Sequence, residues 1–345
     1  MNPIVHDLLI WYDAHRRHLP WRDICNPYST LISETMLQQT QVSTVISYFN
    51  RFMEVFPTLA DLANAPEESV LKLWEGLGYY SRARNLLKGA RQVMAQFGGV
   101  IPCEEKALLS ISGIGPYTAG AIMSIAYNLP VPAVDGNVIR VLARLYAIHE
   151  DVAHKETLAK INILAHALSN NARPGDFNQA LMDLGAGICS PGTPNCARCP
   201  LNRHCEAYKN DDADMLPVKT KKRPPKQMQV GVALITFENR ILVCTRKEKM
   251  LGGLSVFFLN EEGSTKQEML SALEQAKIPC SFKSDLGEAK HVFTHRVWHM
   301  HIYHFTAKRE TDGFHWATRQ ELESLPFPTA MKAAKSKALE ILSHK

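Results

Sequence analysis

Four cysteines within a span of seventeen residues constrain this chain more than any other feature of its sequence. Cys189, Cys196, Cys199 and Cys205 follow the pattern C-x6-C-x2-C-x5-C. Four soft sulfur donors this close together, in a chain where we expect no secretory signal, indicate a tetrahedral sulfur site rather than disulfides. Four unrelated core thiols would not cluster in so polar a segment.

The spacing of the four cysteines bears on which metal they would hold. Zinc sites usually pair their cysteines as two short knuckles, and here only Cys196 and Cys199 form one. The uneven outer gaps favour a [4Fe–4S] cluster, with zinc as the other candidate. Cationic and loop-forming residues lie between the ligands, so the segment could grip phosphates. Electron transfer is the alternative, but the sequence shows no flavin or nicotinamide fingerprint.

Composition limits the class of protein. With 345 residues, 46% hydrophobic and 21% charged, the chain is typical of a globular protein of two domains. Its net charge of +5 permits a polyanionic partner. The first twelve residues carry Asp7 and no basic segment, so we expect a helix there and not a signal peptide. We find no apolar run long enough to cross a membrane, and the unpaired cysteines fit a reducing cytoplasm.

The texture of the sequence changes across residues 209–228. This stretch is rich in proline and lysine, lacks periodicity and is typical of a linker. We expect a mainly helical domain at 1–208 and a smaller α+β domain at 229–345. The periodic patterns predict helices at 42–53, 138–146, 265–276 and 329–342, and strands at 230–237, 241–244 and 298–305.

Residues 108–120 read LLSISGIGPYTAG and predict a hairpin between two helices. Gly113 and Gly115 allow close approach of the backbone to a ligand, and Pro116 suits the first turn of the following helix. The free N–H groups at that helix start could bind a DNA phosphate. A plain joint between two helices is the alternative.

Two carboxylates lie in unlike surroundings. Asp135 precedes the helix predicted at 138–146, where its simplest role is an N-cap. Glu34 lies among apolar residues, so we expect it to be partly buried with a raised pKa. One protonated and one ionised carboxyl group are the pair that breaks glycosidic bonds.

Two further motifs, SETMLQQTQV at 33–42 and GLGYYSRARN at 76–85, resemble those of MutY-type adenine DNA glycosylases in the endonuclease III superfamily. The resemblance covers nearly the whole chain. It implies a helix-hairpin-helix core with an iron–sulfur cluster subdomain, followed by a Nudix-like α+β domain. It also implies base excision repair of double-stranded DNA, with removal of adenine mispaired with 8-oxoguanine and also with guanine. We expect a monomer in the cytoplasm that associates with the nucleoid through DNA.

The position just inside the hairpin separates two branches of this superfamily. Bifunctional members carry a lysine there, which forms a Schiff base and cleaves the strand. This chain has Tyr117, which cannot form an imine, so we expect a monofunctional enzyme. The resemblance implies that Tyr117 hydrogen-bonds within the catalytic pocket, although it could simply pack the hairpin.

The resemblance also assigns roles to other residues. Glu34 would protonate adenine N7, Asp135 would stabilise the oxocarbenium-like sugar, and Asn137 would orient Asp135 or a water molecule. Gln39 and Tyr79 would wedge into the base stack, although an aromatic pair such as Tyr79 and Tyr80 is more often core. The remaining residues assigned to DNA and adenine binding are Trp21, Arg22, Leu37, Gln38, Thr40, Gly113, Gly115 and Gln179.

In the Nudix-like domain, the candidate helix at 267–274 lacks the set of several glutamates and an arginine that holds magnesium, so we expect no pyrophosphate hydrolysis. Phe293, Thr294 and His295 resemble the loop that probes 8-oxoguanine. The Thr294 hydroxyl could accept a hydrogen bond from the N7–H of the oxidised base. The histidines around this loop lack an accompanying acidic or cysteine ligand, and segment 251–259 departs from the family pattern.

Two alternatives stay open. One is a bifunctional glycosylase and lyase acting on pyrimidine lesions, which Tyr117 and the additional domain disfavour. The other is a non-catalytic iron–sulfur protein that binds DNA or senses redox state, which Glu34 and Asp135 in the expected contexts disfavour.

Overall fold

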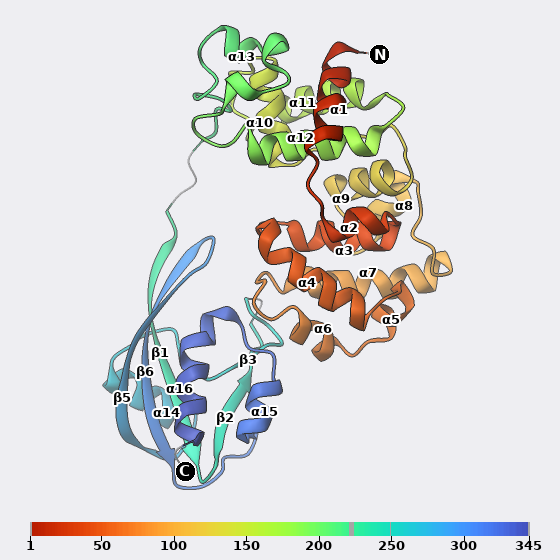
Figure 1. Cartoon of the computed structure of the whole chain (residues 1–345). Coiled ribbons are helices and arrows are strands. Elements are labelled where there is room, and N and C mark those ends of the chain that lie inside the picture. The colour runs from red at the N-terminus through yellow and green to blue at the C-terminus, as the bar shows by residue number, and fades with distance from the viewer. Residues whose placement is uncertain (1, 221–223, 249, 344–345) are drawn as a thin grey trace. The chain divides into compact units, whose positions relative to one another are not determined.

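Residues 2–220, 224–248 and 250–343 are described by a computed structural model of the chain (Figure 1). They group into two units. The first comprises Met1–Ala65 and Ser81–Lys221, and the second comprises Pro66–Tyr80 and Lys222–Lys345. Positions 221–223 of the expected linker lie outside the described residues.

The first unit is helical. Its elements are α1 (Pro3–His15), α2 (Pro20–Ile24), α3 (Pro27–Leu37), α4 (Val42–Val55), α5 (Leu59–Asn64), α7 (Ser81–Phe97), α8 (Glu105–Ser110), α9 (Pro116–Ala121), the π-helical turn η1 (Ile122–Ala126), α10 (Gly136–Leu145), α11 (Lys155–Ser169), α12 (Pro174–Gly187), the 3-10 turns η2 (Cys196–Arg198) and η3 (Asn202–His204), and α13 (Glu206–Lys209). Proline occupies the first turn of α1, α2, α3, α9 and α12, where its missing N–H costs no hydrogen bond.

The second unit combines a sheet with helices. Its elements are α6 (Glu67–Leu73), β1 (Lys226–Phe237), β2 (Arg240–Thr245), β3 (Ser255–Val256), β4 (Phe258–Asn260), α14 (Lys266–Gln275), β5 (Cys280–Val292), β6 (Arg296–Ala307), β7 (His315–Ala317), α15 (Arg319–Ser324), the 3-10 turn η4 (Thr329–Met331) and α16 (Lys332–Ser343).

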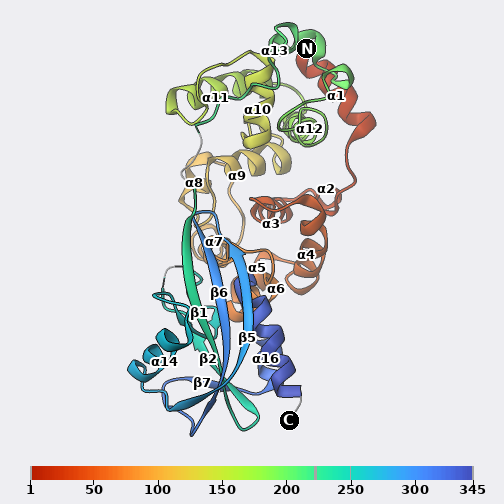
Figure 2. The same ribbon diagram turned by 90° about the vertical axis from the view of Figure 1, so that its left-hand side faces the viewer.

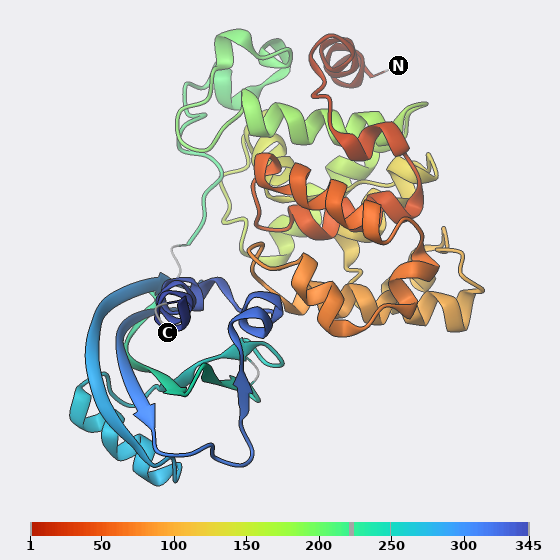
Figure 3. The ribbon, with the colours of Figure 1, turned by 60° about the horizontal axis from the view of Figure 1, so that its bottom comes forward.

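The described strands form one mixed sheet between two helices. Their order is β3-β2-β1-β6-β5, with β4 added to β1 and β7 added to β2. Strands β1 and β6 are parallel and the other pairs are antiparallel. Alternate β1 residues face opposite cores, so Val232 packs with Ala334 of α16 while Ala233 packs with Met269 of α14. Figures 2 and 3 show these two helices on opposite sides of the strands.

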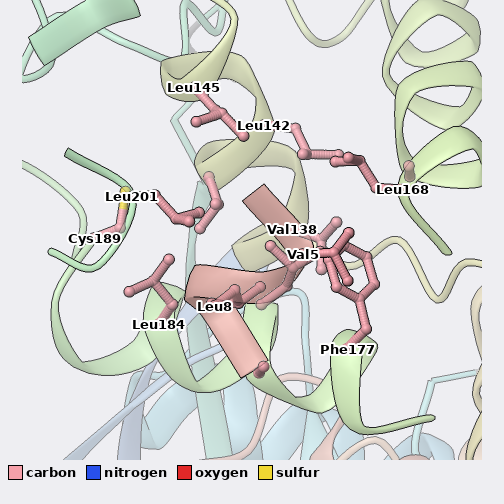
Figure 4. Packing of buried hydrophobic residues seen from close by; sticks show 14 of the residues in the cluster. Val5, Leu8, Val138, Leu142, Leu145, Leu168, Phe177, Leu184, Cys189 and Leu201 are labelled. Carbon is pink, nitrogen blue, oxygen red and sulfur yellow. The ribbon is translucent and has the colours of Figure 1, made fainter. Parts of the chain in front are cut away.

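One hydrophobic core of the first unit lies between α1, α10, α11 and α12. Val5 and Leu8 from α1 meet Val138 from α10 and Phe177 from α12 (Figure 4). Cys189, which follows α12, packs against the same cluster. The cysteine loop is therefore anchored on the core that also positions the start of α10.

The expected hairpin is present. Helix α8 ends at Ser110, and α9 begins at Pro116. Gly113 adopts φ +88°, which other residues rarely tolerate, and a Cβ there would approach the Asn85 backbone to 3.3 Å. The glycine spacing at 113 and 115 therefore predicted the hairpin correctly.

The other expected elements are confirmed with altered ends. The helices expected at 42–53, 138–146 and 265–276 correspond to α4, α10 and α14, and the last expected helix divides into η4 and α16. Strand β1 begins at Lys226 rather than residue 230, because it pairs with β6 from that residue onward. Within the described ranges, no helix is long and apolar enough to cross a bilayer.

Helices α10 and α12 approach so closely that the contact should tolerate no added methyl group. A Cβ at Gly185 would lie 2.7 Å from the Cβ of Asn137. We expect Gly185→Ala to lower the free energy of unfolding by about 1–3 kcal/mol in denaturant titrations. Gly187→Ala is the matched control, because nothing lies within 4 Å of a Cβ at that end of α12. Equal effects of the two substitutions would contradict this close packing.

Candidate active site

A cavity of about 670 Å³ in the first unit brings together segments that are distant in the sequence. Its walls come from α2, α3, the hairpin, the start of α10 and α12. The expected site residues that line it are Trp21, Arg22, Glu34, Leu37, Gln38, Gln39, Thr40, Gly113, Gly115, Tyr117, Asp135, Asn137 and Gln179. Tyr79, Phe293, Thr294 and His295 lie in the second unit. A larger hollow beside α14 contains none of the expected residues.

Glu34 is buried at the cavity wall. It lies in α3, where every residue from Tyr28 to Met36 is buried, and its own exposure is 5%. The Tyr117 hydroxyl donates a hydrogen bond to Oε2 of Glu34. Burial raises the pKa of Glu34 to about 7, and the negative charge of Asp135 also raises it, whereas the Tyr117 hydrogen bond and Arg22 act in the opposite direction. The expected burial and raised pKa are confirmed.

Tyr117 lies in α9, just inside the hairpin. Burial raises the pKa of its hydroxyl well above the ordinary value, and Glu34 raises it further. The hydroxyl therefore keeps its proton at neutral pH and serves as a donor to Glu34. Its oxygen also lies 3.8 Å from Sδ of Met182 in α12. The side chain contacts the buried carboxyl group and does not merely pack the hairpin.

Asp135 is the N-cap of α10 and also lines the cavity. As the N-cap of α10, its Oδ1 accepts a hydrogen bond of 2.8 Å from the backbone N–H of Val138. Its Oδ2 accepts a second bond of 2.8 Å from Nδ2 of Asn137. The two donors fix the orientation of the carboxylate at the wall of the cavity. The structure thus places the Asn137 amide on Asp135.

Arg140, which was not among the residues expected from the sequence, holds the Asn137 side chain through a hydrogen bond. One guanidinium donates to Oδ1 of Asn137 at 2.9 Å, to the carbonyl of Gly185 at 2.7 Å and to the carbonyl of Cys189 at 2.7 Å. It therefore connects the Asp135 segment to the end of α12 and to the first cysteine. The only sequence signal was an arginine inside the apolar stretch of α10.

Arg82 braces the turn that follows α3. Its Nη1 donates to the carbonyls of Thr35 at 2.9 Å, Met36 at 3.0 Å and Gln38. Gln39, in the same turn, adopts φ +60°, a conformation that is uncommon for residues other than glycine. The guanidinium satisfies carbonyls that the end of the helix leaves unpaired, so it supports a strained turn at the cavity mouth.

The four cysteines lie on one loop beside Arg144. Nη1 of Arg144 is 3.4 Å from Sγ of Cys189, and its carbonyl accepts a hydrogen bond of 3.4 Å from Sγ of Cys205. Burial is the main cause that raises the pKa of the Cys199 thiol to about 12; a backbone hydrogen bond at Leu201 opposes it, and the other three cysteines add to it, so the four sulfurs are near neighbours. Four thiols and a buried cation suit a thiolate-bound metal group, whose binding would release protons.

The thiols are nevertheless not arranged as a finished metal site. Across residues 2–220, 224–248 and 250–343, no three His, Cys, Asp or Glu side chains are arranged to hold a metal ion. The four thiols therefore fit a bound metal group through their chemistry and their place on one loop.

The candidate recognition residues of the second unit meet at the turn between β5 and β6. Phe293 packs edge-on against Trp298, with ring centroids 5.1 Å apart. Thr294 Oγ1 and Tyr79 Oη share a hydrogen bond of 2.6 Å. Tyr79 is 47% exposed, so it is not the core residue that its aromatic neighbourhood suggested, whereas Tyr80 is buried. His295 is exposed at the same turn.

The histidines near this turn mostly have hydrogen-bond partners. Contrary to the expectation from the sequence, His301 has an acidic neighbour and lies 2.8 Å from both carboxylate oxygens of Asp285. His299 lies 2.9 Å from Oε1 of Gln227. On the neighbouring helix α14, the Glu268 carboxylate caps the helix start by accepting from Thr265. These side chains serve local structure in this unit.

Comparisons with known proteins agree with this arrangement. Residues 32–166 match the model of the HhH-GPD superfamily of base excision DNA repair proteins, and residues 230–337 match a NUDIX domain. The adenine DNA glycosylase of Mus musculus is 35% identical over 390 residues, which cover 94% of this chain and 76% of that protein. The adenine DNA glycosylase of Buchnera aphidicola subsp. Baizongia pistaciae is 36% identical, covering 84% and 82% respectively.

The first unit also resembles a solved structure. A thermostable thymine-DNA glycosylase superposes with a TM-score of 0.55 and 31% sequence identity. The match covers 60% of this chain and 95% of that one.

The raised pKa of Glu34 makes the stability of the protein depend on pH. Its pKa rises from an ordinary 4.5 to about 7, so the folded state holds a proton that the unfolded state releases between these values. This stabilising contribution is complete below about pH 4.5 and is lost as the pH rises through about 7. We expect Glu34→Gln to be more stable than the wild type at pH 8, by up to about 3 kcal/mol, with little difference at low pH.

Thermal or denaturant unfolding across this pH range would measure the difference. Glu105→Gln, at an exposed position in the first turn of α8, controls for the loss of a carboxylate. A stability difference that does not change with pH would contradict the burial of an ionisable Glu34.

Proposed function

The chain belongs to the adenine DNA glycosylases, base excision repair enzymes that hydrolyse N-glycosyl bonds, and we propose that it removes adenine mispaired with 8-oxoguanine or guanine without cleaving the strand. One observation carries the proposal. Two carboxyl groups in unlike environments face one cavity: Glu34 is buried with a pKa of about 7, and Asp135 is held by two hydrogen-bond donors. This is the pairing that glycosidic bond cleavage requires.

The first step is transfer of a proton to the base. The adenine leaves the DNA stack and enters the cavity, at a cost of a few kcal/mol that is lowest for a weakly paired mismatch. Glu34 in its protonated form donates to adenine N7 and turns the base into a leaving group. Tyr117 keeps the Glu34 carboxyl group in place through its hydrogen bond.

The second step is stabilisation of the sugar. As the bond to adenine breaks, the deoxyribose gains oxocarbenium character, and the Asp135 carboxylate offsets the positive charge. Asn137 fixes the carboxylate through its bond of 2.8 Å, so little reorganisation is needed during the reaction. Glu34, now ionised, activates the attacking water.

The lack of an amine supports a monofunctional reaction. Strand cleavage through a Schiff base needs a lysine near the sugar. Among the described residues that line the cavity there is no lysine, and Tyr117 occupies the position inside the hairpin. Arg17 and Arg22 are the basic residues of the lining, and a guanidinium does not form an imine at neutral pH.

We propose that the second domain reads the opposite base. Thr294 and Tyr79 share a hydrogen bond at an exposed turn, and either hydroxyl could exchange that partner for the edge of 8-oxoguanine. The proposed boundaries are a glycosylase domain at 1–208, a linker at 209–228 and the recognition domain at 229–345, although residues 66–80 group with the second unit and β1 begins at Lys226. Gly115, where nothing lies within 4 Å of an added Cβ, would leave room for a DNA phosphate in the first domain, and Gly113 would supply the turn before it.

We further propose that the cysteine loop holds a [4Fe–4S] cluster through Cys189, Cys196, Cys199 and Cys205. When bound, the cluster supplies a rigid cross-link of the loop. Arg198 and Arg203 lie on the two short turns η2 and η3 of this loop. From there their side chains can contact DNA phosphates.

Metal analysis of the purified protein tests the cluster. We expect about four iron atoms and four sulfides per chain when the protein is purified without oxygen, and loss of both in Cys199→Ser. Cys103→Ser, an exposed cysteine outside the loop, is the matched control and should retain the full iron content. About one zinc per chain would instead support the structural zinc alternative.

Single-turnover base release tests the proposed reaction. On duplexes with one adenine opposite 8-oxoguanine, we expect strand breaks only after treatment with hot alkali, and slower release opposite guanine. Asp135→Asn should lower the rate by at least about a hundredfold while binding to the duplex persists, because the amide carries no charge. Asp214→Asn, at an exposed position, should react as the wild type does.

Breaks without alkali would instead support a lyase. The absence of base release, with binding intact, would favour a binding protein over an enzyme.

A further inference from the structure

A buried acidic residue that the proposed mechanism does not use lies behind the cavity wall. Asp183 interrupts the apolar sequence ALMDL in α12 and is 5% exposed. Its two oxygens accept hydrogen bonds from two arginines. Arg17 donates to Oδ1 through Nε at 2.9 Å and Nη2 at 2.5 Å, and Arg22 donates to Oδ2 at 2.8 Å and to Oδ1 at 3.0 Å.

The contacts fix Arg22 more fully than Arg17. Arg22 grips both oxygens of Asp183, donates to the carbonyl of Arg17 at 3.0 Å and lies over the Tyr12 ring at 5.5 Å. Its side chain is 13% exposed, against 39% for that of Arg17. Both arginines line the cavity that contains Glu34, whereas Asp183 does not reach its surface.

The charges of this cluster are unequal. One carboxylate faces two guanidinium groups, so the cluster keeps a net positive charge beside the cavity. Burial alone would raise the pKa of Asp183, but the hydrogen bonds and charges of Arg22 and Arg17 keep it below the ordinary value. Asp183 therefore stays ionised at neutral pH and offsets half of the cationic charge.

We propose that Asp183 is a positioning residue of the excision site, which holds Arg22 at the cavity wall and neutralises part of the positive charge that faces Glu34. The inference rests on the proposed function, because it concerns the residue that would protonate adenine. A purely structural ion pair would make the same contacts, and the two roles differ in their effect on the pH dependence of the reaction.

The groups that face Glu34 come from three elements. Tyr117 of α9 donates a hydrogen bond, Asp135 at the start of α10 contributes a negative charge, and Arg22 of α2 contributes a positive one. Asp183 itself is faced by Arg17, Arg22 and the Tyr12 hydroxyl, whose pKa of about 12 keeps it neutral. Loss of the Asp183 charge would leave Arg22 to act on Glu34 without its counter-charge and favour the ionised form of Glu34.

The test is the pH profile of single-turnover adenine release. Because Glu34 acts as an acid, the rate falls as the pH rises through its pKa. We expect Asp183→Asn to move this fall to lower pH by about one unit, so that the rate relative to wild type drops about fivefold further between pH 6 and pH 8. Asp183→Glu restores the charge and should return the profile to within a few tenths of a unit of the wild type.

A second Asp→Asn substitution controls for the loss of an ion pair in the same helix. Asp176 lies in the first turn of α12 and accepts a hydrogen bond of 2.8 Å from Arg173, away from the cavity lining. Asp176→Asn should leave the profile unchanged. Thermal midpoints, and binding to a duplex that carries a non-hydrolysable adenosine, show whether a loss of activity is due to unfolding.

If Asp183→Asn does not fold, the Arg17→Gln variant provides a second test. Arg17→Gln leaves Asp183 to neutralise Arg22 alone, so the fall in rate should move to higher pH. A profile that is only scaled down, with the same pH dependence in folded Asp183→Asn or in Arg17→Gln, would overturn the inference. If the wild type released no adenine, the proposed function would fail first, whatever these variants did.

Discussion

The burial of Glu34 is the constraint on which the candidate site depends. A carboxyl group inside a protein loses its hydration, and the charged form loses far more than the neutral one. The protein tolerates this because the group keeps a proton until about pH 7 and accepts a hydrogen bond from Tyr117. Helix α3 packs against α9 and η1, and Tyr117 of α9 contacts the carboxyl group. The raised pKa of Glu34 therefore depends on the assembly of these helices.

Arginine side chains hold this assembly together at the points where regular structure ends. Arg140 joins the Asn137 amide to carbonyls at the end of α12 and in the cysteine loop, and Arg82 collects the carbonyls released at the end of α3. A guanidinium suits this task because its five N–H groups point outward in one plane. Each of these arginines donates to several backbone carbonyls that lack a backbone N–H partner among the described residues. The irregular turns between helices can therefore keep one conformation.

The sequence predicted the helices, strands and hairpin well, but it did not predict which distant segments contact one another. Helical periodicity placed α4, α10 and α14, and the glycine spacing placed the hairpin, because both signals depend on residues within a few positions of each other. The start of β1 was missed by four residues because its pairing with β6 decides it, about seventy positions away. Asp183 was missed although it satisfies the criterion that identified Glu34, a lone carboxylate among apolar residues.

The sequence by itself determined the local features of this protein: the cysteine quartet, the hairpin with its tyrosine, the cap at Asp135 and the alternation of helical and strand segments. Only the tertiary structure decided which carboxyl group keeps a proton and which is held ionised. Glu34 and Asp183 look alike in sequence, yet one meets a phenol and a second carboxylate while the other meets two guanidinium groups. A pKa depends on the charges and the solvent that surround the group, and here they come from segments more than eighty residues apart.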